Sequence, residues 1–233
     1  AFPGANYAIV TKEKTWFGSL GNRELYPEII PNSIDTIYDM ASLTKVVNTT
    51  TCAMQLVEKG LLRIFDPVSR YFSQFRFNDV TVWHLLTHTS GLPEGIYGPK
   101  DRLLPQDVWD KIFAIEELMY KPGTKIVYSD INYMLLGKII EMLSGMPLDE
   151  YAKKNLYEPL EMYNTGFKPD DKYRCAATEY RDDATMTGYV KGCVHDETAY
   201  ALGGVAGHAG LFSTVEDISH FIKMILNDGV YEG

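Results

Sequence analysis

Cysteine is scarce in this chain, and its basic residues are outnumbered by its acidic ones. Three cysteines among 233 residues cannot all pair, which excludes a small scaffold held together by disulfides. The 22 basic and 31 acidic side chains leave a net charge of −9, which argues against a general nucleic-acid or anionic-membrane surface. No apolar run reaches the ~18–20 residues that a transmembrane helix needs. The signal-peptide pattern of a basic region followed by an apolar stretch is also missing.

The composition is that of an ordinary globular protein. Apolar residues make up 45% and charged residues 23% of the chain. This length allows one large domain or two small ones. No repeat or low-complexity tract divides the sequence.

The pattern of apolar residues changes once along the chain. Strand-like residues around a polar turn predict a β-hairpin at about residues 6–20. Helical spacing then predicts a mostly helical body at about residues 42–229, with helices at 42–60, 82–88, 106–119, 131–143 and 148–156. Ser213 and Glu216 have the spacing of a capping box at the start of a last helix. Residues 168–196 show no period and are expected to be loop. No convincing partner strands for the hairpin follow, although a lone hairpin is not a stable sheet.

Ser42 and Lys45 are the first candidates for chemistry. Residues three apart on a helix face the same side, so the Lys45 amine can take the proton of the Ser42 hydroxyl. Ser42 also begins its helix, where free N–H groups favour developing negative charge. The alternative is that Ser42 only caps the helix and Lys45 is solvated, since Ser-x-x-Lys is a common spacing.

Two further segments are candidates. Tyr128 precedes Asp130 at the start of a helix. Beside a lysine it can share the role of a base, because a nearby cation lowers the pKa of the phenol, or it is a core tyrosine with Asp130 as N-cap. Residues 203–210 hold four glycines, which lets the backbone pass close to another element or to a ligand. His208 within this segment is either a ligand-facing donor or a structural histidine.

The sequence does not predict a metal site. Cys175, Cys193, His195 and Asp196 offer possible ligands, but their spacing is not that of a usual zinc site. Cys175 and Cys193 can form one disulfide, although free thiols are the simpler interpretation. No cofactor is predicted.

The order of several motifs carries more information than any one of them. Residues 2–4 read Phe-Pro-Gly, residues 39–45 read Asp-Met-Ala-Ser-Leu-Thr-Lys, and residues 85–93 read Leu-Leu-Thr-His-Thr-Ser-Gly-Leu-Pro. Tyr-Ser-Asp follows at 128–130, Glu-Pro-Leu at 158–160, and Gly-Leu-Phe-Ser-Thr at 210–214. In this order the chain resembles the penicillin-recognising serine hydrolases, on the side of class C β-lactamases, DD-peptidases and esterases. Residues 194–197 and 203–210 resemble a subgroup associated with amidases that act on N-acetylmuramoyl-L-alanine.

The resemblance implies that residues 1–233 form one domain with an α+β fold, a β-lactamase/transpeptidase-like helical subdomain packed on an antiparallel sheet. It also implies a role for each matching residue. Ser42 would be the acylated nucleophile and would offer its N–H to the oxyanion. Lys45 would help to deprotonate it, and Tyr128 would act as general base and pass the proton to the leaving group. Asp130, His208 and Gly210 fall in the substrate-binding blocks. Asp130 departs from the family's usual Asn, since an ionised carboxylate cannot donate a hydrogen bond to a substrate carbonyl.

The family's third motif, Lys-Thr-Gly or His-Thr-Gly on an edge strand, does not occur. We therefore expect the remaining strands of the sheet to lie beyond this chain.

The expected function is a serine hydrolase that cleaves an amide, lactam or ester through an acyl-enzyme. A muramoyl-L-alanine amidase or D-Ala-D-Ala carboxypeptidase is the alternative, and a penicillin or muropeptide sensor or an inactive fragment is the non-enzymatic one. The expected partner is a small molecule or muropeptide, with no nucleic acid. Cell-wall chemistry implies a location in the cell envelope or outside the cell, with the cytoplasm as the alternative location. No sequence pattern assigns an oligomeric state.

Overall fold

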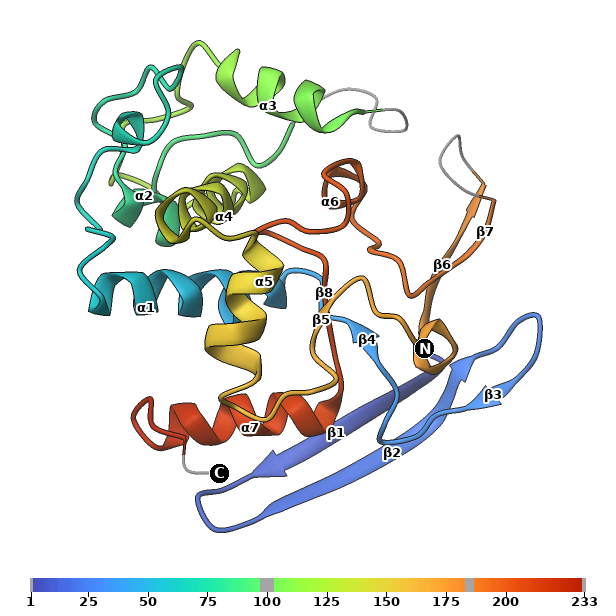
Figure 1. Cartoon of the computed structure of the whole chain (residues 1–233). Coiled ribbons are helices and arrows are strands. Elements are labelled where there is room, and N and C mark those ends of the chain that lie inside the picture. The colour runs from blue at the N-terminus through green and yellow to red at the C-terminus, as the bar shows by residue number, and fades with distance from the viewer. Residues whose placement is uncertain (1, 97–102, 183–186, 232–233) are drawn as a thin grey trace.

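The computed structural model describes residues 2–96, 103–182 and 187–231, and it shows helices packed beside short antiparallel sheets (Figure 1). The fold is α+β, as predicted. A long hairpin runs along one side of the molecule, and helix α7 (Val215–Leu226) packs against it. The remaining helices gather on the other side of α7 and of the strands in the centre (Figure 1).

The predicted hairpin is confirmed and is longer than expected. Strand β1 (Gly4–Val10) pairs antiparallel with β2 (Thr15–Glu24), with Tyr7 opposite Gly18. The sequence pattern offered no partner strand, but β3 (Ile30–Pro31) adds to the far edge of β2. Two residues are too few to show a periodic pattern, which is why this strand was not predicted.

A second sheet forms from three very short strands that are far apart in sequence. Strand β8 (Leu211–Ser213) lies between β4 (Tyr38–Asp39) and β5 (Gly166–Phe167), in the order β4-β8-β5. Phe212 stands opposite Asp39 on one side and Gly166 on the other. This sheet fixes the segment before Ser42 to the end of the glycine-rich segment.

The interpretation of residues 168–196 as loop was wrong. Apart from a short 3-10 turn, η4 (Lys172–Arg174), the segment forms a hairpin of β6 (Ala177–Asp182) and β7 (Thr187–Lys191). Its register shifts between Ala177 and Tyr180. One face carries exposed residues such as Tyr180 and Tyr189, and the less exposed face includes Arg181, Gly188 and Val190. Because a charged residue and a glycine occupy inward positions and the register is irregular, the strands show no apolar alternation, so the sequence gives no signal for them.

The helical body follows the prediction at most positions. A π-helical segment, η1 (Lys45–Thr50), continues into α1 (Thr51–Glu58), and Gly60 ends the run with φ of +69°. The other predicted helices are α2 (Val82–Leu86), α3 (Pro105–Phe113), α4 (Asp130–Ser144) and α5 (Leu148–Ala152) with η3 (Lys153–Tyr157). The short helical elements η2 (Val68–Arg70) and α6 (Glu197–Ala201) were also not predicted.

Two helix ends differ from the prediction, and each difference has a physical cause. Helix α3 stops before residue 119 because the Met119 amide donates to the Gly91 carbonyl at 2.8 Å, outside any helix. The cap of α7 is Thr214, whose hydroxyl accepts from the Asp217 amide at 3.3 Å. Ser213 cannot cap the helix because it belongs to strand β8, where its hydroxyl contacts that of Thr165 at 2.7 Å.

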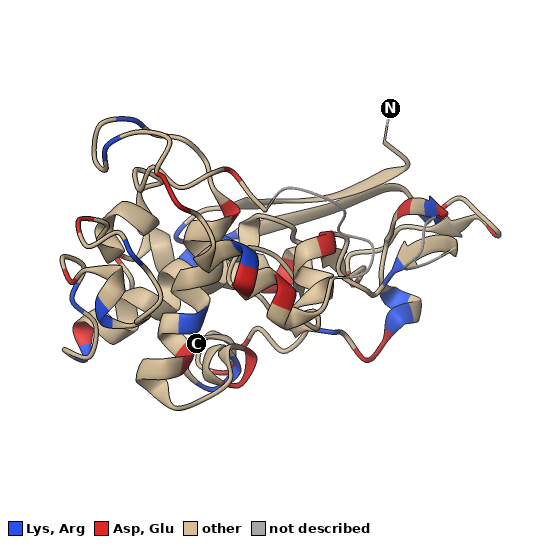
Figure 2. Ribbon diagram, turned by 90° about the horizontal axis from the view of Figure 1, so that it is seen from above, with Lys and Arg blue, Asp and Glu red and all other residues tan. Residues whose placement is uncertain are grey.

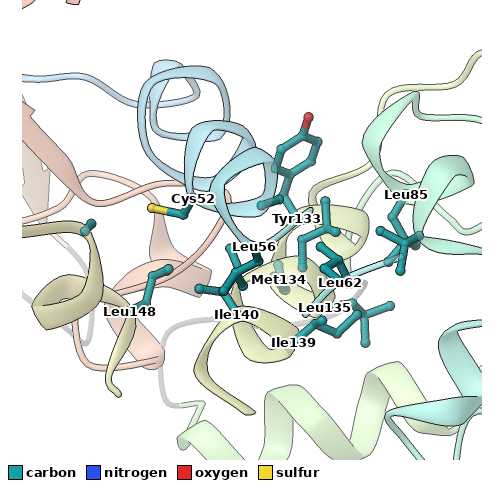
Figure 3. Close-up of a cluster of buried hydrophobic side chains, with 14 of the residues drawn as sticks. Cys52, Leu56, Leu62, Leu85, Tyr133, Met134, Leu135, Ile139, Ile140 and Leu148 are labelled. Atoms are coloured by element: carbon teal, nitrogen blue, oxygen red, sulfur yellow. The ribbon is translucent and has the colours of Figure 1, made fainter. Parts of the chain in front are cut away.

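The main hydrophobic core lies between α1 and α4, where apolar side chains from both helices interdigitate (Figure 3). Helix α4 is buried on almost every side, which explains its nearly continuous apolar sequence. This helix starts at Asp130, so the best-packed element of the molecule carries one of the predicted site residues at its first turn. The labelled members of the core cluster are Cys52, Leu56, Leu62, Leu85, Tyr133, Met134, Leu135, Ile139, Ile140 and Leu148.

Charged side chains of both signs are spread over the ribbon (Figure 2). Several form local pairs, such as Arg70 with Asp66 at 2.9 Å and Lys138 with Glu141 at 2.9 Å. Such exposed pairs contribute little to stability. In the described ranges, no helix combines the length and the apolar character needed to cross a bilayer.

Candidate active site

Ser42 lies on a tight turn that projects it to the surface. Ala41, just before it, has φ of +44°, a conformation that residues with a Cβ rarely adopt. The Asp39 carboxylate accepts from the Ala41 amide at 2.8 Å, and the Thr44 hydroxyl donates to the Ala41 carbonyl at 2.6 Å. The turn is therefore held on both sides of the strained residue, and Ser42 itself remains exposed.

Lys45 is the central residue of the site, and its side chain is almost completely enclosed. It is 2% exposed, and its Nζ donates to Ser42 Oγ at 3.1 Å and to the His208 carbonyl at 3.0 Å. A third contact is an ion pair with Asp130 Oδ1 at 2.7 Å. The three acceptors fix the ammonium beside the serine, so the interpretation of Lys45 as a solvated surface lysine does not fit this geometry.

Tyr128 provides one wall of the site. Its side chain is 49% exposed, and Lys45 Nζ lies 4.7 Å from the centre of its ring. Tyr133 from α4 stands on the same cation, with its ring centre 5.9 Å away. Across the described residues, no hydrogen bond joins the Tyr128 hydroxyl to Ser42 or to Lys45. The structure thus brings the tyrosine ring to the lysine without a direct bond to Ser42.

His208 takes part through its backbone carbonyl. Its imidazole is 1% exposed, and Nε2 contacts Asp196 Oδ1 at 2.9 Å. The ring is therefore packed inside the protein, next to the N-cap of α6, while the carbonyl accepts the hydrogen bond from Lys45. Gly210 has φ of +109°, and a Cβ there would lie 2.7 Å from the Gly204 carbonyl oxygen. Its glycine is required by the fold of the segment itself.

The predicted residues that meet in one place are Ser42, Lys45, Asp130 and Tyr128, joined by the His208 carbonyl. The Ser42 amide has no hydrogen-bond acceptor within the part of the chain that the structure describes. An amide at the first turn of a helix, next to an exposed hydroxyl, is suited to stabilise an oxyanion on a carbonyl attacked there. The arrangement can therefore support acyl transfer to a serine.

The cysteines do not form a second site. All three are free thiols, with Cys52 and Cys175 buried and Cys193 half-buried. Burial raises the pKa of the Cys52 thiol to about 12 and that of Cys175 to about 11. No group of three or more potential metal ligands occurs within residues 2–96, 103–182 and 187–231.

Comparison with known proteins identifies the family. A model of the family described as Beta-lactamase matches residues 1–232. The chain belongs to the beta-lactamase family. Against one relative in Escherichia coli O157:H7, provisionally named D-alanyl-D-alanine carboxypeptidase, it is 33% identical over 99% of this chain and 61% of that protein. An N-acetylmuramyl-L-alanine amidase of Bacillus subtilis is 37% identical over 84% of this chain and 51% of that protein.

The fold of this beta-lactamase-family chain is also that of a solved structure. The octameric penicillin-binding protein homologue from Pyrococcus abyssi matches with a TM-score of 0.78 and 28% identity, over 98% of this chain and 53% of that one. The chain thus spans about half to three fifths of the length of the relatives given above.

Three residues of the candidate site in this beta-lactamase-family chain were not singled out from the sequence. Thr44 is fully buried, and its hydroxyl also accepts from the Leu211 amide at 3.1 Å, which joins the Ser42 turn to β8. Asp39 accepts from the His195 amide at 2.8 Å, and burial raises its pKa. His88 stacks on Tyr128 with ring centres 4.6 Å apart. Thr44 and Asp39 lie in the serine motif, but only the fold shows what they contact.

Proposed function

We propose that this chain is the acyl-transfer part of a serine hydrolase that cleaves an amide or ester bond of peptidoglycan fragments. The observation that carries the proposal is the bond between Lys45 Nζ and Ser42 Oγ at 3.1 Å, with a lysine that is 2% exposed. A buried lysine with three acceptors around one exposed serine is costly to build and serves no packing purpose. Catalysis gives a reason for it.

The reaction proceeds in two steps. Ser42 Oγ attacks the substrate carbonyl carbon while the phenolate form of Tyr128 accepts the hydroxyl proton, and the carbonyl oxygen becomes an oxyanion that the Ser42 amide stabilises. The oxyanion collapses, the bond to the leaving amine or alcohol breaks, and Tyr128 returns the proton to that group. Water then attacks the ester on Ser42 by the same route and releases the acid. Lys45 stabilises the negative charge that develops on Ser42 Oγ.

The substrate class is inferred from the two names among the relatives and from Asp130. A carboxypeptidase and an amidase both act on muropeptides, one on a terminal peptide bond and one on the bond to muramic acid. The Asp130 carboxylate is bound to Lys45, so it accepts hydrogen bonds and does not offer the donor that an Asn would offer. We therefore place muropeptide amides ahead of β-lactams, and the cell envelope ahead of the cytoplasm as the site of action.

Covalent labelling tests the nucleophile. The chain is treated with a fluorophosphonate probe and with a fluorescent penicillin, and the labelled residue is identified by peptide mass spectrometry. Ser42→Ala is expected to lose the label completely. Ser73→Ala, at an exposed serine outside the site, is the matched control and is expected to label like the wild type. Equal labelling of wild type and Ser42→Ala would refute the assignment.

Turnover separates an enzyme from a sensor. A panel of a β-lactam, a D-Ala-D-Ala peptide, a muramoyl-L-alanine compound and a short p-nitrophenyl ester is incubated with wild type and Ser42→Ala. Release of product from the muramoyl or peptide amide by the wild type alone supports the proposal. Labelling of Ser42 without product from any member would indicate a binding module and contradict hydrolysis.

A further inference from the structure

The residue on either side of Tyr128 is bonded to one histidine. The Val127 amide donates to the His88 backbone carbonyl at 2.9 Å, and the Ser129 amide donates to His88 Nδ1 at 3.0 Å. Between these two bonds the His88 ring stacks on the Tyr128 ring, with centres 4.6 Å apart and planes inclined by 27°. Both peptide neighbours of the tyrosine and its ring are therefore held by His88.

The protonation state of His88 follows from these bonds. A backbone amide can only donate, so His88 Nδ1 must accept and carries no proton. The Asn132 side chain is 3.3 Å from the same nitrogen and can add a second donor. A proton on Nδ1 would oppose the Ser129 amide directly and remove one of the two bonds that flank Tyr128.

We propose that His88, in its neutral form, is the positioning residue that holds Tyr128 beside Lys45, and that a proton on its imidazole releases Tyr128. The inference rests on the proposed function, since it assigns a purpose to the placement of the general base. His88 does not touch the nucleophile and acts only through the tyrosine. Its backbone is also unusual, with φ of +55°, which turns the side chain toward the segment that carries Tyr128.

The groups around the ring keep it neutral at physiological pH. Lys45 faces it from η1, Tyr128 stacks on one face, and Asp130 and Tyr133 face it from the first turn of α4. Burial and then the positive charge of Lys45 lower the pKa of His88, and the Asp130 carboxylate opposes them. We call the contacts of His88 with residues 127–129 the His88 clamp. The clamp is therefore closed above the ordinary histidine pKa of ~6.5 and opens only in more acidic solution.

The first test is a pH titration of the folded chain by NMR, with the histidine rings and backbone amides followed together. The Ser129 amide is expected to shift with the same midpoint as the His88 ring, below pH ~6.5. This measurement does not need turnover, so it tests the clamp even if the chain hydrolyses none of the substrates. A Ser129 amide that stays still while His88 titrates would overturn the inference.

The second test compares His88→Asn with His84→Asn. Asparagine tolerates the left-handed backbone of position 88 and offers an acceptor to Ser129, but it does not titrate and cannot stack in the same way. His84 is the matched control, because its Nδ1 also accepts a backbone amide, that of Thr81 at 3.1 Å, away from Tyr128.

For p-nitrophenyl ester hydrolysis, His88→Asn is expected to lower kcat/KM by about tenfold at neutral pH through loss of the stacked ring. The wild type is expected to lose kcat/KM in acidic solution, and His88→Asn is expected to abolish that fall. His84→Asn should keep both the rate and the acidic fall of the wild type. An acidic fall with an unchanged midpoint in His88→Asn, with a folded state verified by circular dichroism, would refute the role of His88.

Discussion

Replacing Thr44 by valine tests how much the Thr44 hydroxyl contributes to holding the turn that presents Ser42. Thr44 Oγ1 donates to the Ala41 carbonyl at 2.6 Å and accepts from the Leu211 amide at 3.1 Å, and both Thr44 and Leu211 are fully buried. Valine has nearly the same shape, so packing is kept and only the hydroxyl is lost. The Ala41 carbonyl still accepts from the Thr44 amide at 3.1 Å, but the Leu211 amide loses the hydroxyl as its acceptor.

The expected cost follows from that loss. A buried donor without a partner costs about 1–3 kcal/mol, so Thr44→Val should lower the free energy of unfolding by about 2 kcal/mol. For a chain of this size, that corresponds to a fall in Tm of about 4–8 °C. Because strained Ala41 also loses a bond, Ser42 should move from its place beside Lys45, and its rate of labelling should fall by about tenfold or more.

Thr36→Val is the control that separates a loss of stability from a change at Ser42. Thr36 is equally buried, and its hydroxyl accepts from the Ser33 amide at 3.2 Å, before strand β4. Urea unfolding gives the stability of both variants, and the fluorophosphonate labelling rate gives the state of Ser42. Thr36→Val should lose stability and keep the labelling rate. If Thr44→Val lost stability but labelled as fast as Thr36→Val, the hydroxyl would not position the nucleophile.

Three further predictions follow from the structure. In the folded chain, a thiol reagent at pH 8 should modify only the half-buried Cys193, and all three cysteines should react after unfolding without a reductant. A single reactive thiol in the unfolded chain would instead show a disulfide between Cys175 and Cys193. Gly207→Ala should cost about 2–3 kcal/mol in urea unfolding, since its Cβ would lie 2.0 Å from the Tyr133 carbonyl oxygen, and an unchanged midpoint would contradict this packing. Because the pKa of His88 is lower in the folded than in the unfolded chain, the free energy of unfolding should fall as pH drops below ~6.5 and through the folded pKa, and His88→Asn should lose that part of the slope.

The sequence predicts the long elements of this fold well because their side chains repeat regularly. Helix α7 and the hairpin of β1 and β2 have such repeats, and the apolar run of α4 is too long for a strand. The short strands β4, β5 and β8 have two or three residues each, and their partners are more than 40 residues away along the chain. No local pattern predicts such pairings, because they are stabilised by contacts made only after the chain has folded.

For the site, the sequence indicates which residues matter more clearly than how they act. The motif order places Ser42, Lys45 and Tyr128 together, and the structure brings Lys45 to both of the others. The sequence does not predict that Lys45 binds the His208 carbonyl, because every residue has a backbone carbonyl and its residue type does not show what that carbonyl binds. For the same reason, the sequence does not predict that a histidine such as His88 accepts a hydrogen bond from a backbone amide.

The glycine-rich segment explains how that carbonyl reaches Lys45. Its glycines allowed two interpretations, close approach to a ligand or to another element, and the contacts of Gly207 favour the second. The Cβ of any other residue at Gly207 would lie 3.0 Å from the Gly137 Cα as well as against Tyr133, so the segment rests directly on the backbone of α4. The same helix supplies Asp130 at its first turn. Close packing of the two backbones therefore sets the spacing between the His208 carbonyl and the Asp130 carboxylate, and Lys45 lies between them at 3.0 Å and 2.7 Å. A side chain at position 207 would widen this spacing, so the glycine acts on the nucleophile through the lysine without touching either of them.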